Sequence, residues 1–327
     1  MSRVEQFLLG SGHNRACVQV GLVNNMPDWA MRATELQFAR VLKEAAGALD
    51  VRLRLFSLRS IVRDEQTRSR MAGFYDDAAL LEAANIDALI ITSAQPGVAE
   101  LREEPYWPEL ARMIAWAETG TISTVFSGVA AQAAALELDG IGRRTLPQKL
   151  CGIYESTRVE DDPLFFNTNV SVPVPHSRDS DIAESDLLAK GYRVLSRLGN
   201  GQVDIFTREP PGQSRFVLFQ GHPEYDPATL GRDYLRVMGC FLRGESDEAP
   251  RIPENCFDRA TEGQLEDLIE DKESDLAPFR ELVTAALPLK TWHANTVRLF
   301  ANWLTLVAAA KARKLASRNI HTRRRAS

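Results

Sequence analysis

Five strand-like segments that alternate with helical patterns constrain the fold of this chain more than any other feature. The segments are ACVQVGLVN (16–24), VRLRLFSL (51–58), IDALIITSA (86–94), STVFSG (123–128) and RFVLFQ (215–220). Residues 51–58 alternate in the manner of a strand with one wetter face, whereas near-continuous apolar runs such as the other segments are typical of strands that are buried on both faces of a parallel sheet. Between the first two segments, Phe38, Val41, Leu42 and Ala45 follow the spacing of one helix face. Alternating strands and helices imply βαβ units, so we predict an α/β fold with a mainly parallel sheet flanked by helices.

The rest of the chain predicts additions to this core. Residues 145–215 are richer in short β-like pieces, and the composition then becomes acidic and proline-containing before a strongly periodic helix over 292–315. We therefore expect an α/β core over 1–245, an acidic loop and C-terminal helices packing on it over 246–312, and a basic, disordered tail over 313–327.

The composition argues against several functional classes. The 327 residues carry a net charge of -5, so we expect no nucleic-acid partner. No run of about 18 apolar residues predicts a membrane-spanning helix. The four cysteines form no CxxC pair and have no histidine at zinc spacing, so we expect neither disulfides nor a bound metal. Residues 1–16 lack the apolar region of a signal peptide, which favours a cytoplasmic protein that acts on small molecules.

The sharpest chemical motif is FQGHPEYD at 219–226, in which a buried strand runs into Gly-His-Pro-Glu. His222 then lies at the carboxyl end of a strand, where open α/β sheets hold their sites. Glu224 can orient the imidazole and stabilise its protonated form, as the third member of a catalytic triad does. When the motif is taken alone, a loop histidine beside an exposed carboxylate is the alternative.

A second motif, TVFSGVAAQAA at 124–134, predicts a strand, a tight Ser-Gly corner and a helix that begins with small residues. In α/β hydrolases such a turn presents the nucleophile, but here the apex is Gly128, which has no side chain. We call this sharp strand-to-helix turn the elbow. An elbow followed downstream by His-Pro-Glu resembles the arrangement of class I glutamine amidotransferases, which use a cysteine at the elbow.

The chain resembles more closely the homoserine O-acyltransferases of the succinyltransferase type, which share that fold. The similarity runs over approximately residues 18–305 and rests on segments in the family's order. They are NNMPDWAMRATELQF, IDALIITSAQPGVAE, YWPEL, KLCGIYE, PHSR, GHPEYD and WHANTVRLFANWL. The resemblance implies a homodimeric enzyme of methionine biosynthesis that binds no cofactor and uses an acyl-CoA, with succinyl-CoA as the expected donor.

The resemblance also assigns catalytic roles. His222 would be the general base and Glu224 its orienting carboxylate. Arg236, on the helix after the GHPEYD loop, would bind the α-carboxylate of the amino acid through its bidentate guanidinium. Without the resemblance, Arg236 is a solvated helix arginine.

Three more positions acquire a role in the same way. Lys149 and Ser177 would line the substrate pocket, although a surface lysine and a turn serine explain them equally well from the sequence alone. Gly97 falls where the family's choice of acyl donor is set. The absence of a carboxylate at this position favours succinyl over acetyl transfer.

The elbow departs from the family pattern. The family has Phe-x-Cys-x-x-x-Gln-Ala, whereas this chain has FSGVAAQA at 126–133, so Gly128 stands at the position of the nucleophilic cysteine. Glycine tolerates the backbone of an elbow but offers no thiol to carry an acyl group. One hypothesis is direct transfer, in which His222 deprotonates homoserine, or a similar hydroxy amino acid such as serine, for attack on the thioester. This route predicts sequential kinetics without an acyl-enzyme. Ser127 is the alternative carrier, although it precedes the apex of the turn.

Other interpretations stay open. The chain could be a non-catalytic homologue that binds an amino acid or an acyl-CoA, although His222, Glu224 and Arg236 are all retained. Gly128 could be a substitution in an otherwise ordinary enzyme. A glutaminase would need the same missing thiol.

Overall fold

The computed structural model describes residues 7–8, 17–94, 96–271 and 273–325 of the chain. Its centre is a set of parallel strands: β2 (Val18–Val23), β3 (Val51–Ser57), β5 (Ala88–Ile91), β6 (Ser123–Ser127) and β11 (Arg215–Phe219). They pair in the order β3-β2-β5-β6-β11. Most of their residues are buried, as their apolar sequences predict. The predicted α/β class with parallel strands at its centre is confirmed.

An antiparallel extension continues the sheet from β11. Its strands are β10 (Val203–Arg208), β9 (Arg193–Leu198), β7 (Arg144–Arg158) and β8 (Ser171–Asp181). Two short strands, β1 (Phe7–Leu8) and β4 (Tyr75–Asp77), pair with β3 at the other side. The described residues thus form one 11-stranded sheet in the order β1-β3-β2-β5-β6-β11-β10-β9-β7-β8, with β4 beside β3.

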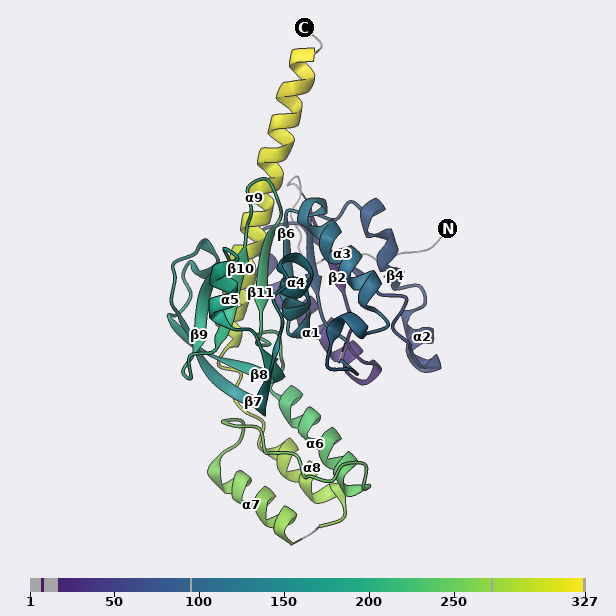
Figure 1. The fold of residues 1–327 in the computed structure, drawn as a ribbon, viewed down its shortest axis with the longest axis vertical. Helices are drawn as coiled ribbons and strands as arrows, with labels where there is room; N and C mark the ends of the chain where they lie inside the picture. The colour runs from purple at the N-terminus through teal and green to yellow at the C-terminus, as the bar shows by residue number, and fades with distance from the viewer. Residues whose placement is uncertain (1–6, 9–16, 95, 272, 326–327) are drawn as a thin grey trace.

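Helices cover both faces of the parallel part of the sheet (Figure 1). α1 (Asp28–Ala46) and α9 (His293–Arg325) pack on one face, while α3 (Trp107–Gly120) and α4 (Val129–Asp139) pack on the other. Phe300 of α9 lies between Phe38 of α1 and Phe219 of β11, with ring centroids 6.3 and 6.2 Å away. Short helical elements occupy the connections: α2 (Glu65–Met71), η1 (Ala78–Ala83), η2 (Leu101–Glu103), η3 (Pro163–Phe165) and α5 (Glu184–Ala189).

A separate helical group lies beyond one end of the sheet (Figure 1). It consists of α6 (Ala228–Leu242), α7 (Arg259–Glu270) and α8 (Leu276–Ala285). Its apolar cluster is built on Tyr234, Met238, Leu265, Phe279 and Val283. The predicted core over 1–245 therefore ends with a helix, α6, that packs against α7 and α8 rather than on the sheet.

The last helix is longer than the sequence pattern predicts. α9 continues to Arg325 and projects beyond the sheet (Figure 1). The segment 313–325, assigned from sequence to a disordered tail, is helical in the structure, and residues 326–327 lie outside the described part. Within the described ranges, no helix combines the length and the apolar character needed to cross a membrane.

Candidate active site

The turn between β6 and α4 has the geometry of a nucleophile elbow. Gly128 adopts φ 64° and ψ −129°, a region that other residues enter only with strain. Its amide donates to the carbonyl of Phe219 at 2.8 Å, which fixes the turn against the end of β11. No side chain caps α4. The amide of Ala131 donates to the carbonyl of Gly128 at 3.0 Å, so the amides of Val129 and Ala130 and the positive dipole end of the helix are the groups left beside the pocket that Val129 lines.

His222 and Glu224 form a buried pair just beyond β11. His222 Nδ1 lies 3.0 Å from Glu224 Oε1, and the two residues are only 8% and 3% exposed. The imidazole also stacks on the ring of Tyr225, with centroids 4.3 Å apart and an interplanar angle of 8°. Because an ionised carboxylate only accepts hydrogen bonds, Glu224 keeps the proton of the neutral ring on Nδ1. The Nε2 atom then keeps its lone pair, as a general base requires.

The imidazole lies directly against the elbow. A Cβ at Gly128 would be 2.9 Å from His222 Cε1 and 3.2 Å from its Nε2. The structure therefore brings the base that the sequence predicts to the apex of the predicted turn. The ring also fills part of the volume that a larger residue at 128 would need, so the glycine and the position of the ring match each other.

A pocket of about 360 Å³, the central pocket, opens beside the elbow. Its lining comes from α1, the segment after β5, the first turn of α4, β7, β8 and α6. Besides Gly128, the lining includes the sequence-predicted residues Lys149, Ser177, His222 and Arg236. None of the chain's cysteines belongs to the lining that the structure describes. Nor does any group of three or more metal-ligating side chains in the described ranges have the arrangement of a metal site.

Three of these side chains converge on Asp233, a residue that the sequence analysis missed. Its Oδ2 accepts hydrogen bonds from Lys149 Nζ at 3.2 Å and from Ser177 Oγ at 3.3 Å. Its Oδ1 accepts from Arg236 Nη2 at 2.7 Å. Burial alone would raise the pKa of Asp233, but Lys149 and Arg236 outweigh it and lower the pKa. The carboxylate is therefore ionised, and the i,i+3 spacing of Asp233 and Arg236 on one helix was the available sequence signal.

Arg236 lines the central pocket and has one hydrogen-bond donor without a partner among the described residues. Its guanidinium lies 4.5 Å above the ring of Trp29, a cation–π arrangement that fixes its plane. Its Nε is buried and has no partner among the described residues. A planar donor set with one open position suits a carboxylate ligand.

Gly97 lies next to Pro96, which lines the central pocket, but Gly97 itself is not part of the lining. The amides of Gly97 and Val98 donate to the buried carboxylate of Glu104, at 2.5 and 2.9 Å. Among the described residues, a Cβ at residue 97 would meet only Glu104 Oε1, at 3.9 Å, so a Cβ has room there.

A buried His–Asp pair lies against the loop 221–226. His176 and Asp204 are 0% and 1% exposed, and His176 Nε2 lies 3.4 Å from Asp204 Oδ1. Burial lowers the pKa of His176, so the ring stays neutral near pH 7. A Cβ at Gly221 would lie 2.7 Å from His176 Nε2 and 2.9 Å from Asp204 Oδ1. The glycine of the GHPE motif is thus required by the close approach of this pair.

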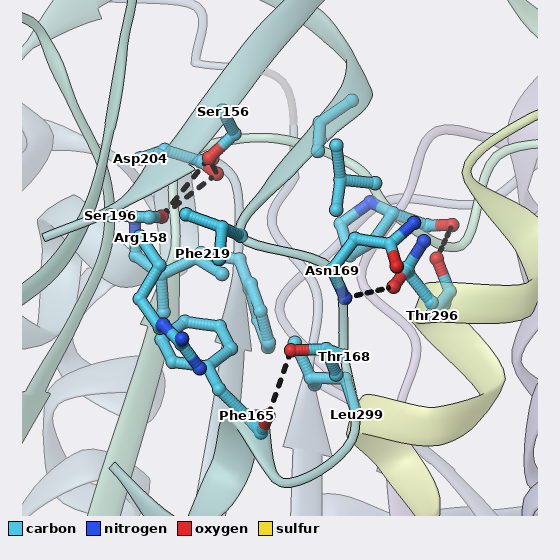
Figure 2. Close-up of a pocket in the computed structure, with 16 residues that line it drawn as sticks. Ser156, Arg158, Phe165, Thr168, Asn169, Ser196, Asp204, Phe219, Thr296 and Leu299 are labelled. Atoms are coloured by element: carbon cyan, nitrogen blue, oxygen red, sulfur yellow. Dashed lines mark hydrogen bonds between the residues drawn. The ribbon is translucent and has the colours of Figure 1, made fainter. Parts of the chain in front are cut away.

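Asp204 also lines a second, smaller cavity (Figure 2). Its volume is about 50 Å³, and Asp204 Oδ2 accepts there from Ser156 Oγ at 2.5 Å and from Ser196 Oγ at 3.2 Å. A space of this size holds a few waters at most, so it is too small for the substrates.

Residues at the start of the last helix hold the loop 221–226 in place. Trp292 Nε1 donates to the carbonyl of Tyr225, and Thr296 Oγ1 donates to that of Pro223, both at 3.1 Å. Both side chains are almost fully buried. The position of the base therefore depends on a segment that is distant in sequence.

The sequence is similar to proteins of known family over nearly its whole length. A family model described as HTS: Homoserine O-succinyltransferase matches residues 9–313. A homoserine O-succinyltransferase of Rhodopseudomonas palustris is 44% identical over 300 residues, which cover 89% of each chain. The corresponding protein of Methylorubrum extorquens is 43% identical over 296 residues, covering 89% of this chain and 87% of the relative.

Solved structures share the architecture at low identity. A glutamine amidotransferase from Methylobacillus flagellatus matches with a TM-score of 0.50 and 11% identity, covering 90% of this chain and 96% of that one. At this identity the likeness concerns the fold alone, and it confirms the predicted amidotransferase-like architecture.

Proposed function

The chain belongs to the homoserine O-succinyltransferase family, and we propose that it transfers the succinyl group of succinyl-CoA to the hydroxyl of L-homoserine. The observation that carries the proposal is the position of His222 Nε2 beside the elbow and within a pocket large enough for both reacting groups. The products are the O-succinyl ester and free CoA. The reaction belongs to methionine biosynthesis, and we expect it in the cytoplasm and in a homodimer.

His222 acts as the general base, and Glu224 orients its ring and stabilises the imidazolium that forms. The uncapped N–H groups of the first turn of α4 are suited to the oxyanion of the tetrahedral intermediate. Such donors are worth most in a site that excludes water, and both members of the pair are almost fully buried.

The acceptor amino acid is held at the Asp233 cluster. Its α-carboxylate binds the open face of Arg236, where Nε has no partner among the described residues. Its ammonium group binds Asp233, which the cluster keeps ionised. Lys149 and Ser177 position that carboxylate through their hydrogen bonds. A homoserine held at both ends can present its hydroxyl to His222.

The proposal is tested by incubating the purified chain with succinyl-CoA and L-homoserine, and detecting the ester and the released thiol. L-serine and acetyl-CoA in separate reactions establish the specificity for the acceptor and the donor. Calorimetric binding of either substrate without turnover would instead support a non-catalytic binding protein. Activity that arises only in a Gly128→Cys variant would show that the pocket is intact and the present chain disabled. That variant also requires the His222 ring to move, because a Cβ would lie 2.9 Å from Cε1.

Replacing Arg236 with lysine is expected to raise the KM for homoserine about tenfold, because a point charge cannot reproduce the bidentate contact. The kcat should change much less, since the side chain does not touch the reacting atoms. Steady-state kinetics with varied homoserine measure both. Arg232→Lys is the matched control, because Arg232 lines the same pocket but bonds only to Thr229, at 3.3 Å. Equal effects of the two substitutions would contradict the assigned role.

Replacing Gly97 with glutamate is expected to lower kcat/KM for succinyl-CoA about tenfold relative to acetyl-CoA, because a new carboxylate repels the free carboxylate of the succinyl group. Among the described residues, the space around residue 97 admits a Cβ. Competition between the two donors measures the ratio directly, and Gly97→Gln separates charge from size. An unchanged ratio in the glutamate variant would remove Gly97 from the acyl-binding region.

A further inference from the structure

Ser93 places a hydroxyl where the elbow lacks a side chain. It lies two residues beyond the end of β5, is half-buried and lines the central pocket. Its Oγ is 3.6 Å from the point where a Cβ of residue 128 would be, and His222 Nε2 is 3.2 Å from the same point. The hydroxyl and the basic nitrogen therefore adjoin one small volume. No hydrogen bond joins the Ser93 hydroxyl to another residue of the described ranges, so it is available to react.

Ser127 lies on the Nδ1 side of the His222 ring, whereas Ser93 lies near its Nε2 side. Its Oγ donates to Glu224 Oε1 at 3.1 Å and lies 3.4 Å from His222 Nδ1. It is buried and lies on the side of the imidazole that faces away from the lone pair of Nε2. Ser127 can thus stabilise the His–Glu pair, but His222 cannot activate it through Nε2.

Two other hydroxyls of the central pocket are engaged in hydrogen bonds. Ser177 donates to Asp233 at 3.3 Å, and Thr229 accepts from Gln37 Nε2 at 2.8 Å. A nucleophile, a base that can reach it and a carboxylate that orients the base are the parts of an acyl-transfer triad. Ser93 Oγ and His222 Nε2, which both lie within 4 Å of one point beside the elbow, and Glu224, which pairs with His222 Nδ1, can supply these parts.

We propose that Ser93 is the catalytic nucleophile, which carries the succinyl group between CoA and homoserine in place of an elbow side chain. The inference rests on the proposed function and refines its route, since direct attack by homoserine was the expectation from sequence. In the first half-reaction, His222 Nε2 takes the proton of Ser93 Oγ, which attacks the thioester carbonyl carbon. The C–S bond then breaks, and the departing sulfur receives that proton as free CoA thiol.

The second half-reaction reverses the roles. His222 takes the proton of the homoserine hydroxyl, whose oxygen attacks the ester carbonyl of the acylated Ser93. The bond from that carbon to Ser93 Oγ breaks, and Oγ recovers the proton from His222. In both halves the first-turn N–H groups of α4 are suited to bind the oxyanion. No electron transfer and no further reactant is needed.

The test uses the full chain with succinyl-CoA in the absence of homoserine. Intact-mass measurement should show one added succinyl group, fragment spectra should place it on Ser93, and an equivalent of CoA thiol should be released. Ser93→Ala should abolish the adduct and lower transfer to homoserine about 10³-fold. Ser171→Ala is the matched control and should keep the adduct, because Ser171 is exposed, donates to Glu155 and does not line the central pocket. Ser93→Cys should form a thioester in its place, which neutral hydroxylamine cleaves.

The outcomes separate this inference from the proposed function. A wild-type chain that transfers succinyl groups without acylating Ser93, or a Ser93→Ala variant with unchanged transfer, would overturn the inference and leave the proposed function standing. Acylation of Ser93 with no passage of the group to homoserine would support the inference and overturn the proposed acceptor. Since the adduct is measured without an acceptor, the absence of acylation counts against Ser93 whatever the turnover.

Discussion

Replacing His222 with asparagine will lower succinyl transfer about 10⁴-fold while homoserine still binds. The imidazole is the group whose basic nitrogen lies 3.2 Å from the apex position of the elbow, and its other nitrogen is fixed by Glu224 at 3.0 Å. An asparagine amide can still donate to Glu224, but it has no lone pair basic enough to take a hydroxyl proton. The proposed mechanism uses this nitrogen in each half of the reaction, so its loss affects both.

The measurement is thiol release from succinyl-CoA at saturating homoserine, with calorimetry of homoserine binding on the same variant. His293→Asn is the matched control, because His293 pairs with Glu44 at 2.7 Å and does not line the central pocket. The control should retain full activity. A His222→Asn variant that keeps more than about a tenth of the rate would exclude general-base catalysis by this residue, because such catalysis contributes at least about 10².

Replacing Gly152 with alanine will destabilise the chain by about 3 kcal/mol or more. Its φ is 154°, and a Cβ would lie 2.3 Å from the carbonyl oxygen of Glu254 and 2.8 Å from its nitrogen. These are backbone atoms and cannot rotate away. They are also fixed by hydrogen bonds at 2.9 Å, from Glu254 N to Cys151 O and from Ile153 N to Glu254 O. The substitution must therefore separate β7 from the segment that joins α6 to α7.

Urea unfolding of the variant measures this loss. Gly142→Ala provides the control, because no heavy atom lies within 4 Å of its Cβ position. We expect the control to stay within about 0.5 kcal/mol of the parent chain. Activity should fall with stability in the Gly152 variant, since Lys149 lies on the same strand, three residues before it. A Gly152→Ala chain as stable as the control would mean that the two segments are not bonded as described.

The parallel half of the sheet was predictable because strands that are buried on both faces have a recognisable sequence pattern. This pattern is an apolar run with β-branched residues, as in β5 and β6. The order and the antiparallel pairing of β7 to β10 could not be predicted, because long-range contacts set them and a local sequence pattern does not encode such contacts. For the same reason α6 could be predicted as a helix but not placed. Its apolar residues, such as Tyr234 and Met238, fit a sheet face as well as the α7–α8 pair that they contact.

The candidate site shows the same division. His222, Glu224 and Gly128 stand in two local motifs, so sequence could identify them and the structure could bring them together. Asp233 was missed because it is distinguished only by its hydrogen bonds with Lys149, Ser177 and Arg236, which lie on three different elements. Ser93 was missed because nothing in its own segment marks it, and only its distance from the elbow distinguishes it from an ordinary serine at the end of a strand.

The hydrogen bonds from Trp292 and Thr296 to the loop 221–226 affect when the loop can be fixed during synthesis of the chain. A ribosome makes the elbow, the base and the acceptor-binding helix before it makes the segment that clamps the loop, and domains generally begin to fold from the N-terminus during synthesis. A nascent chain that has emerged only as far as α8 thus lacks two of the contacts that fix the base. The His222–Glu224 pair is therefore fully held only after the start of α9 has been synthesised.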